Sequence, residues 1–252
     1  MRKSGVAANV DQQIARLAAL LKESQRVTVL TGAGVSAASG VPTFRGSGGL
    51  WRSYDPMTLA TPQAFARDPV LVWEWYDWRR QLIAAAQPNP AHHVIADWSR
   101  TRPGFTLITQ NVDGLHERAG TERVLRLHGS IWEVRCTGRC RSGPRVDERA
   151  PLPATDLPPR CEACHALMRP GVVWFGESLD PAIVAAASRA TETCDLFITI
   201  GTSAAVYPAA GFIHEARANG ATVAEINPDA TEASGVVDIS IRGKAEDVLP
   251  RL

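Results

Sequence analysis

The chain has 252 residues, 45% of them hydrophobic, which is enough for one large domain, or one domain with a small insert, around a real core. Its formal charge of +1 argues against nucleic acid or a membrane surface as the main partner. Residues 1–25 are charged and amphipathic, and no segment has the length of a transmembrane helix, so we expect no signal peptide, no membrane partner and a cytoplasmic location.

A glycine-rich turn after the first predicted strand is the most informative feature of the chain. An amphipathic helix over 11–24 precedes an apolar, β-branched strand that begins near Arg26. The next residues, Gly32, Gly34 and Ala37, fit the G-x-G-x-x-G/A fingerprint of dinucleotide binding. In that fingerprint the glycines let the backbone approach a pyrophosphate, and amides at the start of the following helix hold the phosphates. An ordinary tight turn is the alternative interpretation.

The segment after the fingerprint separates this chain from a dinucleotide-binding dehydrogenase. Such an enzyme has a second strand that ends in an acidic residue about 20 positions later. Here residues 40–51 read GVPTFRGSGGLW, a glycine-rich loop with Phe44, Arg45 and Trp51 through which no strand is expected. We therefore predict a dinucleotide site covered by a mobile loop.

Predicted helices and strands alternate along the rest of the chain. An aromatic helix runs from the N-cap pair Asp68-Pro69 to about Ala86. Further helices are predicted at 91–100, 181–193 and 209–219, and strands at 105–109, 124–127, 172–177, 196–200, 222–226 and 237–241. This alternation is typical of an α/β fold with a doubly wound, Rossmann-like parallel sheet, in which ligands bind beyond the carboxyl ends of the strands.

Polar residues gather where the predicted strands end. The clusters are Gln110, Asn111 and Asp113; His128; Gly201, Thr202 and Ser203; and Asn227, Pro228 and Asp229. Asn111 and Asp113 can hold a carboxamide such as nicotinamide, with an Asx turn as the alternative. His128 suits a general base near neutral pH, although a lone histidine is more often structural. The shared placement at strand ends is a stronger indication than any single motif.

Four of the five cysteines cluster in a segment of different character. Residues 135–170 are rich in Cys, Pro and Arg and have no clear periodicity. The spacing is C-x3-C followed by C-x2-C, formed by Cys136, Cys140, Cys161 and Cys164. With no export signal, a reducing compartment and a structural zinc site held by four thiolates are favoured over disulfides. The fifth cysteine, Cys194, precedes a buried strand and is interpreted as a core thiol.

Tyr76 and Arg79 lie three residues apart on the aromatic helix and therefore on one face. A phenol and a guanidinium together can bind a carboxylate. From the spacing alone, an arginine that snorkels over aromatic packing is the favoured interpretation.

These segments together resemble the sirtuins, a family of NAD-dependent protein lysine deacylases, from about Gln25 to the C-terminus. The matching motifs are GAGVSAASGVPTFRG, TQNVDGLHERAG, LHGS, the two cysteine pairs, VVWFGE, GTSAAVYPA and IN at 226–227. Within the family the chain is most similar to class III, which contains the mitochondrial desuccinylase and the bacterial CobB-type enzymes. That closer match rests on Ala60-Thr61-Pro62, PRC at 159–161, RPGVVWFGESLDPA and Tyr76-x-x-Arg79.

The resemblance implies an NAD-binding Rossmann-like domain over 1–134 and 171–252. It also implies a zinc-binding module at 135–170, which forms the small domain with a helical insert at about 46–90. Acyl-lysine of a protein substrate would enter between the two domains. The implied chemistry gives free lysine, nicotinamide and O-acyl-ADP-ribose, with one structural zinc away from the reaction.

The resemblance also implies a role for each matching residue. His128 would be the general base that deprotonates a ribose hydroxyl. The implied NAD-binding set is Gly32, Ala33, Gly34, Ser36, Phe44, Arg45, Trp51, Gln110, Asn111, Asp113, Gly201, Thr202, Ser203, Asn227, Pro228, Asp229 and Ala245. The implied acyl-lysine set is Val172, Trp174, Phe175, Gly176 and Glu177, as a short added strand. Tyr76 and Arg79 would recognise the acid end of succinyl- or malonyl-lysine, which reverses the interpretation from spacing.

The chain departs from the class pattern in the first cysteine pair, Cys136 and Cys140, which has one extra residue, and at two single positions. Gly171 stands where histidine is common, and Ala245 stands where cysteine is common. Four other functions remain: mono-ADP-ribosyl transfer to protein, plain deacetylation without acidic-acyl preference, a non-catalytic NAD-sensing module, and hydride transfer. The intact His128, Asn111 and Asp113 argue against the sensing module, and the missing second strand argues against hydride transfer. The sequence leaves the oligomeric state open, and a monomer is compatible with it.

Overall fold

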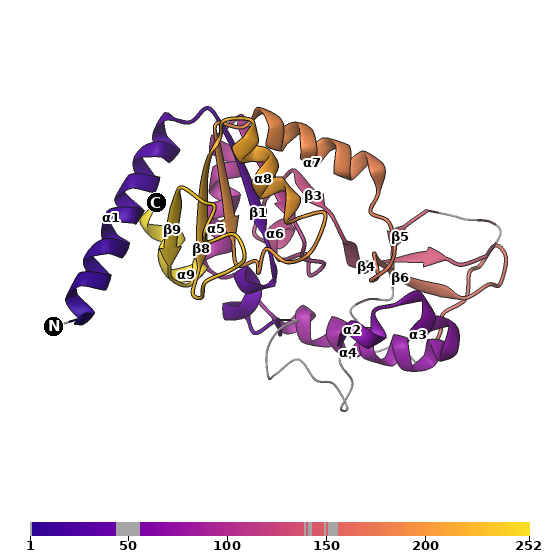
Figure 1. Ribbon diagram of the computed structural model, residues 1–252. Helices are drawn as coiled ribbons and strands as arrows, with labels where there is room; N and C mark the ends of the chain where they lie inside the picture. The colour runs from indigo at the N-terminus through magenta and orange to yellow at the C-terminus, as the bar shows by residue number, and fades with distance from the viewer. Residues whose placement is uncertain (1, 44–55, 139, 141–142, 149, 151–155) are drawn as a thin grey trace.

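The computed structural model describes residues 2–43, 56–138, 140, 143–148, 150 and 156–252, which form a large α/β domain and a smaller domain beside it (Figure 1). The helices are α1 (Arg2–Glu23), α2 (Pro56–Leu59), α3 (Pro62–Arg67), α4 (Pro69–Ala85), α5 (Pro90–Thr101), α6 (Leu115–Arg118), α7 (Pro181–Thr193), α8 (Gly211–Ala218) and α9 (Ala245–Val248), with 3-10 helices η1 (Ala33–Ser39) and η2 (Leu249–Arg251). The strands are β1 (Arg26–Thr31), β2 (Gly104–Thr109), β3 (Val124–Arg126), β4 (Gly129–Cys136), β5 (Arg145–Val146), β6 (Met168–Val172), β7 (Leu196–Ile200), β8 (Thr222–Asn227) and β9 (Ile239–Arg242). Among these residues, no helix combines the length and hydropathy needed to cross a membrane.

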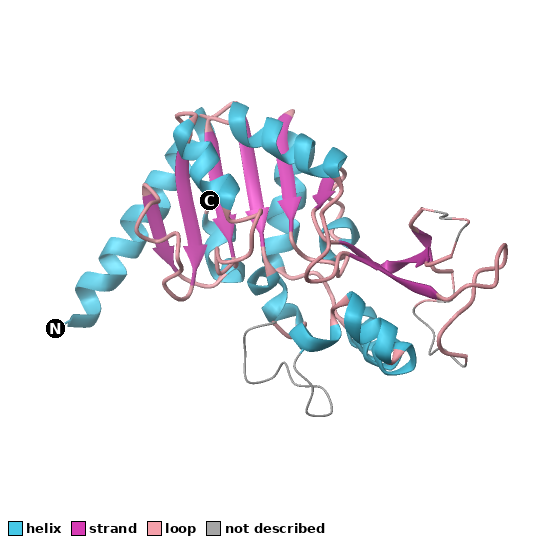
Figure 2. Ribbon diagram, turned by 45° about the vertical axis from the view of Figure 1, so that its right-hand side comes forward, coloured by secondary structure: helices cyan, strands magenta, loops and turns pink. Residues whose placement is uncertain are grey.

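The large domain is built on a six-stranded sheet in which every neighbouring pair is parallel. Its order is β3-β2-β1-β7-β8-β9. Counted along the chain, this is the 3-2-1-4-5-6 order of the doubly wound fold, so the predicted fold class is confirmed. The strand order reverses between β1 and β7, and the arrowheads in Figure 2 point toward the edge where the ligand is expected.

Both faces of this sheet are covered, which explains why its strands are apolar without alternation. On one face Val27 and Val29 of β1 pack with residues of α1, α5 and α9. On the other face Leu30 packs with residues of α7 and α8. The segment 26–31 is therefore buried except at its first residue. Within the sheet, β7 spans the predicted residues, whereas β9 begins two residues later than predicted.

The smaller domain packs α2, α3 and α4 against an antiparallel sheet of order β5-β4-β6. Helix α4 begins as predicted, because the Asp68 carboxylate accepts a hydrogen bond from the Leu71 amide at 2.9 Å and Pro69 occupies the first turn. The small sheet extends beyond the cysteine-rich segment at both ends, from Gly129 of β4 to Val172 of β6.

The strand predicted at 172–177 is wrong in most of its length. Strand β6 ends at Val172, and the next five residues form a turn. Gly176 has a φ of +86°, a conformation that favours glycine. The turn is closed by the Glu177 amide, which donates to the Trp174 carbonyl at 3.0 Å. The apolar run at 172–175 predicted a strand, but Gly176, which follows it, allows the chain to turn.

A buried ion pair ties α4 to the small sheet. The guanidinium of Arg80 lies 2.7 Å from the carboxylate of Asp147, and their side chains are 5% and 4% exposed. Arg80 also donates to the Ile131 carbonyl of β4 at 2.7 Å and lies over the Trp73 ring. Asp147 follows β5, so this pair joins the cysteine-rich segment to the helix that carries Tyr76 and Arg79.

We expect Asp147→Ala to destabilise the protein by about 3–5 kcal/mol, because it leaves the Arg80 charge buried without its carboxylate. The measurement is the urea midpoint of unfolding, followed by tryptophan fluorescence. Arg251→Ala is the matched control, since it removes an ion pair with Asp11 whose side chains are 48% and 64% exposed, worth less than about 1 kcal/mol. Equal midpoints for the two variants would show that the buried pair contributes no more to stability than the exposed one.

Candidate active site

The loops after β1 and β7 lie against each other at the point where the strand order reverses. The Gly34 amide donates to the Gly201 carbonyl at 2.8 Å, and the Gly32 amide donates to the Ile200 carbonyl at 3.1 Å. A Cβ atom at Gly34 would lie 2.7 Å from the Gly201 carbonyl oxygen, so only glycine permits this approach. The predicted fingerprint therefore forms a tight double loop with its backbone close to the ligand edge.

The helix predicted after the fingerprint is a 3-10 helix of seven residues, Ala33–Ser39. Gly40 ends it with a φ of +83°. Its short length brings Ser36 back under the double loop, fully buried. Phe44, Arg45 and Trp51, the residues predicted to lie on the covering loop, fall outside the described residues.

Ser36 is the centre of a buried hydrogen-bond network at the floor of the site. Its hydroxyl lies 2.8 Å from a carboxylate oxygen of Asp113, 3.2 Å from Asn111 Nδ2 and 3.4 Å from His92 Nε2. Because the Asn89 amide donates to His92 Nδ1, His92 carries its proton on Nε2 and donates to Ser36. Ser36 thus accepts from Asn111 and His92, and its own hydrogen goes to Asp113.

Asn111 and Asp113 are brought together as predicted, on the segment after β2. Burial raises the pKa of Asp113, while hydrogen bonds from the Leu115 amide and the Ser36 hydroxyl act in the opposite direction. Both Asn111 N–H groups point inward, to Ser36 and to the Gly32 carbonyl, the latter at 3.1 Å. Acceptor oxygens of the two residues are therefore the groups available to a carboxamide.

Two buried histidines behind this network were not singled out from the sequence. The rings of His92 and His116 have centroids 4.8 Å apart. Burial lowers the pKa of His92 to about 4 and that of His116 well below its usual value, so both are neutral at pH 7. The sequence could have indicated His92 through its position: it is the third residue of a helix whose N-cap is Asn89, and the two residues form a capping box.

His128 stands just beyond the end of β3, half-buried. Its Nδ1–H donates to the Gln110 carbonyl at 2.9 Å, so Nε2 of the neutral ring keeps its lone pair. Burial lowers the pKa of His128, and the hydrogen bond to Gln110 acts in the opposite direction. At neutral pH the ring is uncharged and able to accept a proton. The Gln110 side chain in turn donates to the Thr202 hydroxyl at 2.9 Å, which joins the ends of β2 and β7.

The residues predicted for the far end of the ligand surround the end of β8. Asn227 Nδ2 donates to the Asp229 carbonyl at 3.3 Å, and Pro228 and Asp229 are exposed. Ser203 is half-buried beside Thr202. Ala245 is instead 5% exposed and packs in the core at the start of α9, so its side chain belongs to the core.

Glu225, which sequence reasoning missed, anchors the loop after β8. The residue is 1% exposed, and its carboxylate accepts hydrogen bonds from Thr231, from Ser234 at 2.7 Å and from Arg242 at 2.9 Å. Burial acts to raise its pKa, but these hydrogen bonds outweigh burial and lower the pKa overall. The Glu225 anchor fixes the backbone around Asp229.

Tyr76 and Arg79 lie together on the small-domain side of the site. The Tyr76 hydroxyl, 3% exposed, accepts a hydrogen bond from the Trp174 indole at 2.9 Å. Burial raises the pKa of Tyr76 to about 12, so the phenol stays protonated. Burial lowers the pKa of Arg79, while the Tyr76 and Asp113 groups act in the opposite direction. Its guanidinium carbon is 5.1 Å from the Trp75 ring centroid.

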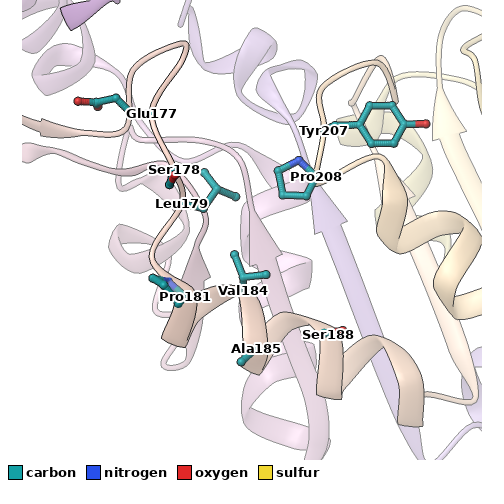
Figure 3. A pocket seen from close by; sticks show the side chains of 9 residues that line it. All are labelled: Glu177, Ser178, Leu179, Pro181, Val184, Ala185, Ser188, Tyr207 and Pro208. Atoms are coloured by element: carbon teal, nitrogen blue, oxygen red, sulfur yellow. The ribbon is translucent and has the colours of Figure 1, made fainter.

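The turn over 173–177 bridges His128 and the small domain. The Val173 amide donates to the His128 carbonyl, and the Phe175 amide donates to the Ala60 carbonyl, both at 2.9 Å. Val172 and Trp174 are buried, whereas Phe175 is 39% exposed and Gly176 is exposed. Beyond Glu177 the surface opens into a cavity of about 620 Å³, which Figure 3 shows between the loop to Leu179, helix α7 and the Tyr207-Pro208 turn.

The four predicted zinc ligands converge, although they come from segments 20 residues apart. The ligand atoms of Cys136, Cys140, Cys161 and Cys164 all lie within 4.8 Å of one another. Four of the sulfur–sulfur distances are 3.2–3.6 Å, near the roughly 3.8 Å edge of a tetrahedral zinc–thiolate site and far above the length of a disulfide bond. Gly138 allows the C-x3-C loop to approach Cys164 closely, because a Cβ atom at this position would lie 2.7 Å from the Cys164 sulfur. The geometry fits one structural zinc ion.

Comparisons with known proteins find similar sequences and structures. A family model described as the Sir2 family matches residues 32–208. An NAD-dependent protein deacylase of Aquifex aeolicus is 50% identical over 230 residues, which cover 91% of this chain and 95% of the relative. A Sir2 homologue solved as an NAD complex is 48% identical, with a TM-score of 0.87 over 93% of this chain and 90% of that chain. A Sir2 structure with a p53 peptide and NAD+ is 29% identical, with a TM-score of 0.83 over 94% and 95%.

Proposed function

Because the chain belongs to the Sir2 family, we infer that it is an NAD-dependent protein lysine deacylase, and we propose that it prefers acyl groups ending in a carboxylate. The deacylase activity follows from relatives of about half-identical sequence. The acidic preference rests on one observation of this structure: a buried phenol, Tyr76, lies one helical turn from Arg79 on α4 and contacts Trp174 in the turn that follows β6.

In this proposal NAD is the co-substrate and lies across the reversal point of the sheet. NAD supplies nicotinamide as the leaving group and the ribose that takes the acyl group. Asn111 and Asp113 would orient the carboxamide from the network around Ser36. The double loop of Gly32, Ala33, Gly34 and Gly201 would let the phosphates approach the backbone closely, because three of these positions carry no side chain, and Thr202, Ser203 and the loop after β8 would hold the adenosine half.

His128 would act as the general base. Its protonated Nδ1 is held by the Gln110 carbonyl, so Nε2 can take the proton of a ribose hydroxyl. Its lowered pKa keeps the imidazole neutral at pH 7. Acyl-lysine would enter along the turn over 173–177, whose exposed Phe175 and Gly176 leave room for a peptide strand beside them.

Tyr76 and Arg79 would bind the acid end of the acyl chain. A carboxylate accepts hydrogen bonds only, and these two residues offer a phenol hydrogen and a guanidinium fork. A charge buried beside them is stabilised by Arg79, whose own pKa is already lowered by burial. An acetyl group offers no carboxylate to either residue.

We expect Arg79→Met to lower kcat/KM for a succinyl-lysine peptide steeply, by roughly the 2–5 kcal/mol typical of truncating one partner of a buried charge pair. Turnover of the matched acetyl-lysine peptide should change little, since a methyl group does not reach the arginine. The measurement is the ratio of kcat/KM for the two peptides before and after substitution. An unchanged ratio would make Arg79 a packing residue and the protein a plain deacetylase.

Mass spectrometry of the same reactions separates the remaining alternative. Incubation with NAD and acetyl-, malonyl- or succinyl-lysine peptides should remove the acyl mass and release nicotinamide. Mono-ADP-ribosyl transfer would instead add mass to the peptide or protein acceptor. Persistence of the acyl group together with such an addition would overturn the deacylase assignment.

A further inference from the structure

We propose that Trp174 is a specificity-positioning residue: its indole N–H occupies the acceptor side of the Tyr76 hydroxyl and so aims the hydroxyl hydrogen at the carboxylate of an acidic acyl group. This inference rests on the proposed function and adds a residue that controls it. Trp174 acts through Tyr76 and needs no contact of its own with the carboxylate.

The geometry of the pair fixes which atom donates. An indole N–H can only donate, so the 2.9 Å contact between Trp174 Nε1 and Tyr76 Oη uses a lone pair of the phenol oxygen. Both side chains are 3% exposed, which leaves little water to compete. Among the described residues, the Tyr76 hydroxyl hydrogen has no acceptor. A buried hydroxyl in this state favours an incoming acceptor.

This arrangement discriminates between acyl groups in two ways. A succinyl or malonyl carboxylate supplies the missing acceptor and receives a charge-assisted hydrogen bond. An acetyl methyl group supplies none and leaves a buried donor unsatisfied, which costs free energy. Without the indole N–H, the phenol can turn its hydrogen elsewhere, and both effects weaken.

Two neighbouring side chains hold the indole in place. The guanidinium carbon of Arg169 lies 3.4 Å from the Trp174 ring centroid, and the Phe65 ring centroid lies 5.3 Å away. Arg169 is itself fixed by the Val172 carbonyl at 2.9 Å and by the Glu177 carboxylate at 2.8 Å. Trp174 therefore cannot rotate out of the contact without breaking a cation–π stack.

The same contacts give Glu177 a structural role beside the predicted one. Its carboxylate pairs with Arg169 through both oxygens and also accepts the Trp174 amide at 2.8 Å. These bonds lower the pKa of Glu177 although burial opposes them, so the carboxylate stays charged. In this inference Glu177 fixes the conformation of the turn over 173–177 and the position of Arg169. Arg169 in turn holds the Trp174 indole.

The test is Trp174→Phe, which keeps an aromatic ring and deletes the N–H. We expect the succinyl-to-acetyl ratio of kcat/KM to fall by about fivefold or more, the equivalent of one net hydrogen bond. A circular dichroism spectrum that matches the wild type checks that the variant is folded. Trp73→Phe is the matched control, because this buried indole of α4 donates to the Met168 carbonyl at 2.8 Å and not to Tyr76. It should leave the ratio unchanged.

A double-mutant cycle separates positioning from packing. In a Tyr76→Phe background, which lacks the hydroxyl, Trp174→Phe should cause no further fall in the ratio. Additive effects of the two substitutions would overturn the inference, as would a ratio unchanged by Trp174→Phe. A low ratio in the wild type that Arg79→Met does not alter would overturn the proposed acidic preference itself. A ratio that responds to Arg79→Met but not to Trp174→Phe would overturn only the role of Trp174.

Discussion

The His128→Ala protein is expected to bind NAD and to lose deacylation of every acyl-lysine peptide, by about 10²–10⁴-fold in kcat. A general base stabilises the transition state and contributes little to ground-state affinity. The structure gives His128 the features of a base: one ring nitrogen is engaged with Gln110, the other keeps its lone pair, and the pKa is lowered. Isothermal titration with NAD and steady-state kinetics measure the two properties separately.

The matched control is His214→Ala, an exposed histidine of α8, which should change neither property. The pH profile adds a second check. Because the folded-state pKa of His128 lies below 6.5, the neutral base is present at pH 7 and is lost as the pH falls through that lowered pKa. The acidic limb of kcat/KM should therefore lie below 6.5. A variant within about tenfold of wild-type kcat would remove His128 from the catalytic role.

The topology explains why these residues form one site although they are distant in the sequence. All six strands of the large sheet run parallel, so the residues that follow β1, β2, β7 and β8 emerge at one edge. Hydrogen bonds then couple them in pairs, such as Gln110 with Thr202 and Asn111 with the Gly32 carbonyl. These contacts fix the loops relative to one another, so the proposed positions of NAD and of the base depend on the same hydrogen bonds.

The sequence predicted the large sheet well because its strands are buried on both faces and read as uninterrupted apolar runs. The small domain was harder, because its elements are stabilised by contacts between distant segments. The pairing of Arg80 with Asp147 spans 67 positions and leaves no local pattern. The turn over 173–177 was mistaken for a strand because Trp174 packs against Phe65 of α3 and Tyr76 of α4 rather than in a sheet.

The candidate site shows the same limit. Motif residues such as His128 and Asn111 could be found, because strand-end position and residue type are both local. Some of the partners that complete the buried network could not be found. His92 lies on α5, far along the chain from Ser36, and only the fold places its ring 3.4 Å from that hydroxyl. Likewise, the stacking of Arg169 on Trp174 depends on the conformation of the turn over 173–177, which the sequence did not predict.

Removal of zinc is expected to unfold the small domain and to abolish activity. Structural zinc sites of four thiolates contribute apparent binding free energies of about 10–16 kcal/mol, which become folding free energy when the site exists only in the folded state. Strand β6 leads directly into the turn that carries Trp174, and Asp147 holds α4 through Arg80. Loss of the cluster should therefore disorganise the acyl-lysine side of the site, while the large sheet keeps its own core.

The measurements are elemental analysis, which should give one zinc ion per chain, and circular dichroism with activity during titration with a chelator. Cys161→Ser should lose the metal and reproduce the effect of the chelator. Cys194→Ala is the matched control, because this buried thiol lies outside the cluster and should leave zinc content unchanged. Freshly purified, active protein without zinc would contradict the assignment, and the four thiols would then hold the module together by packing alone.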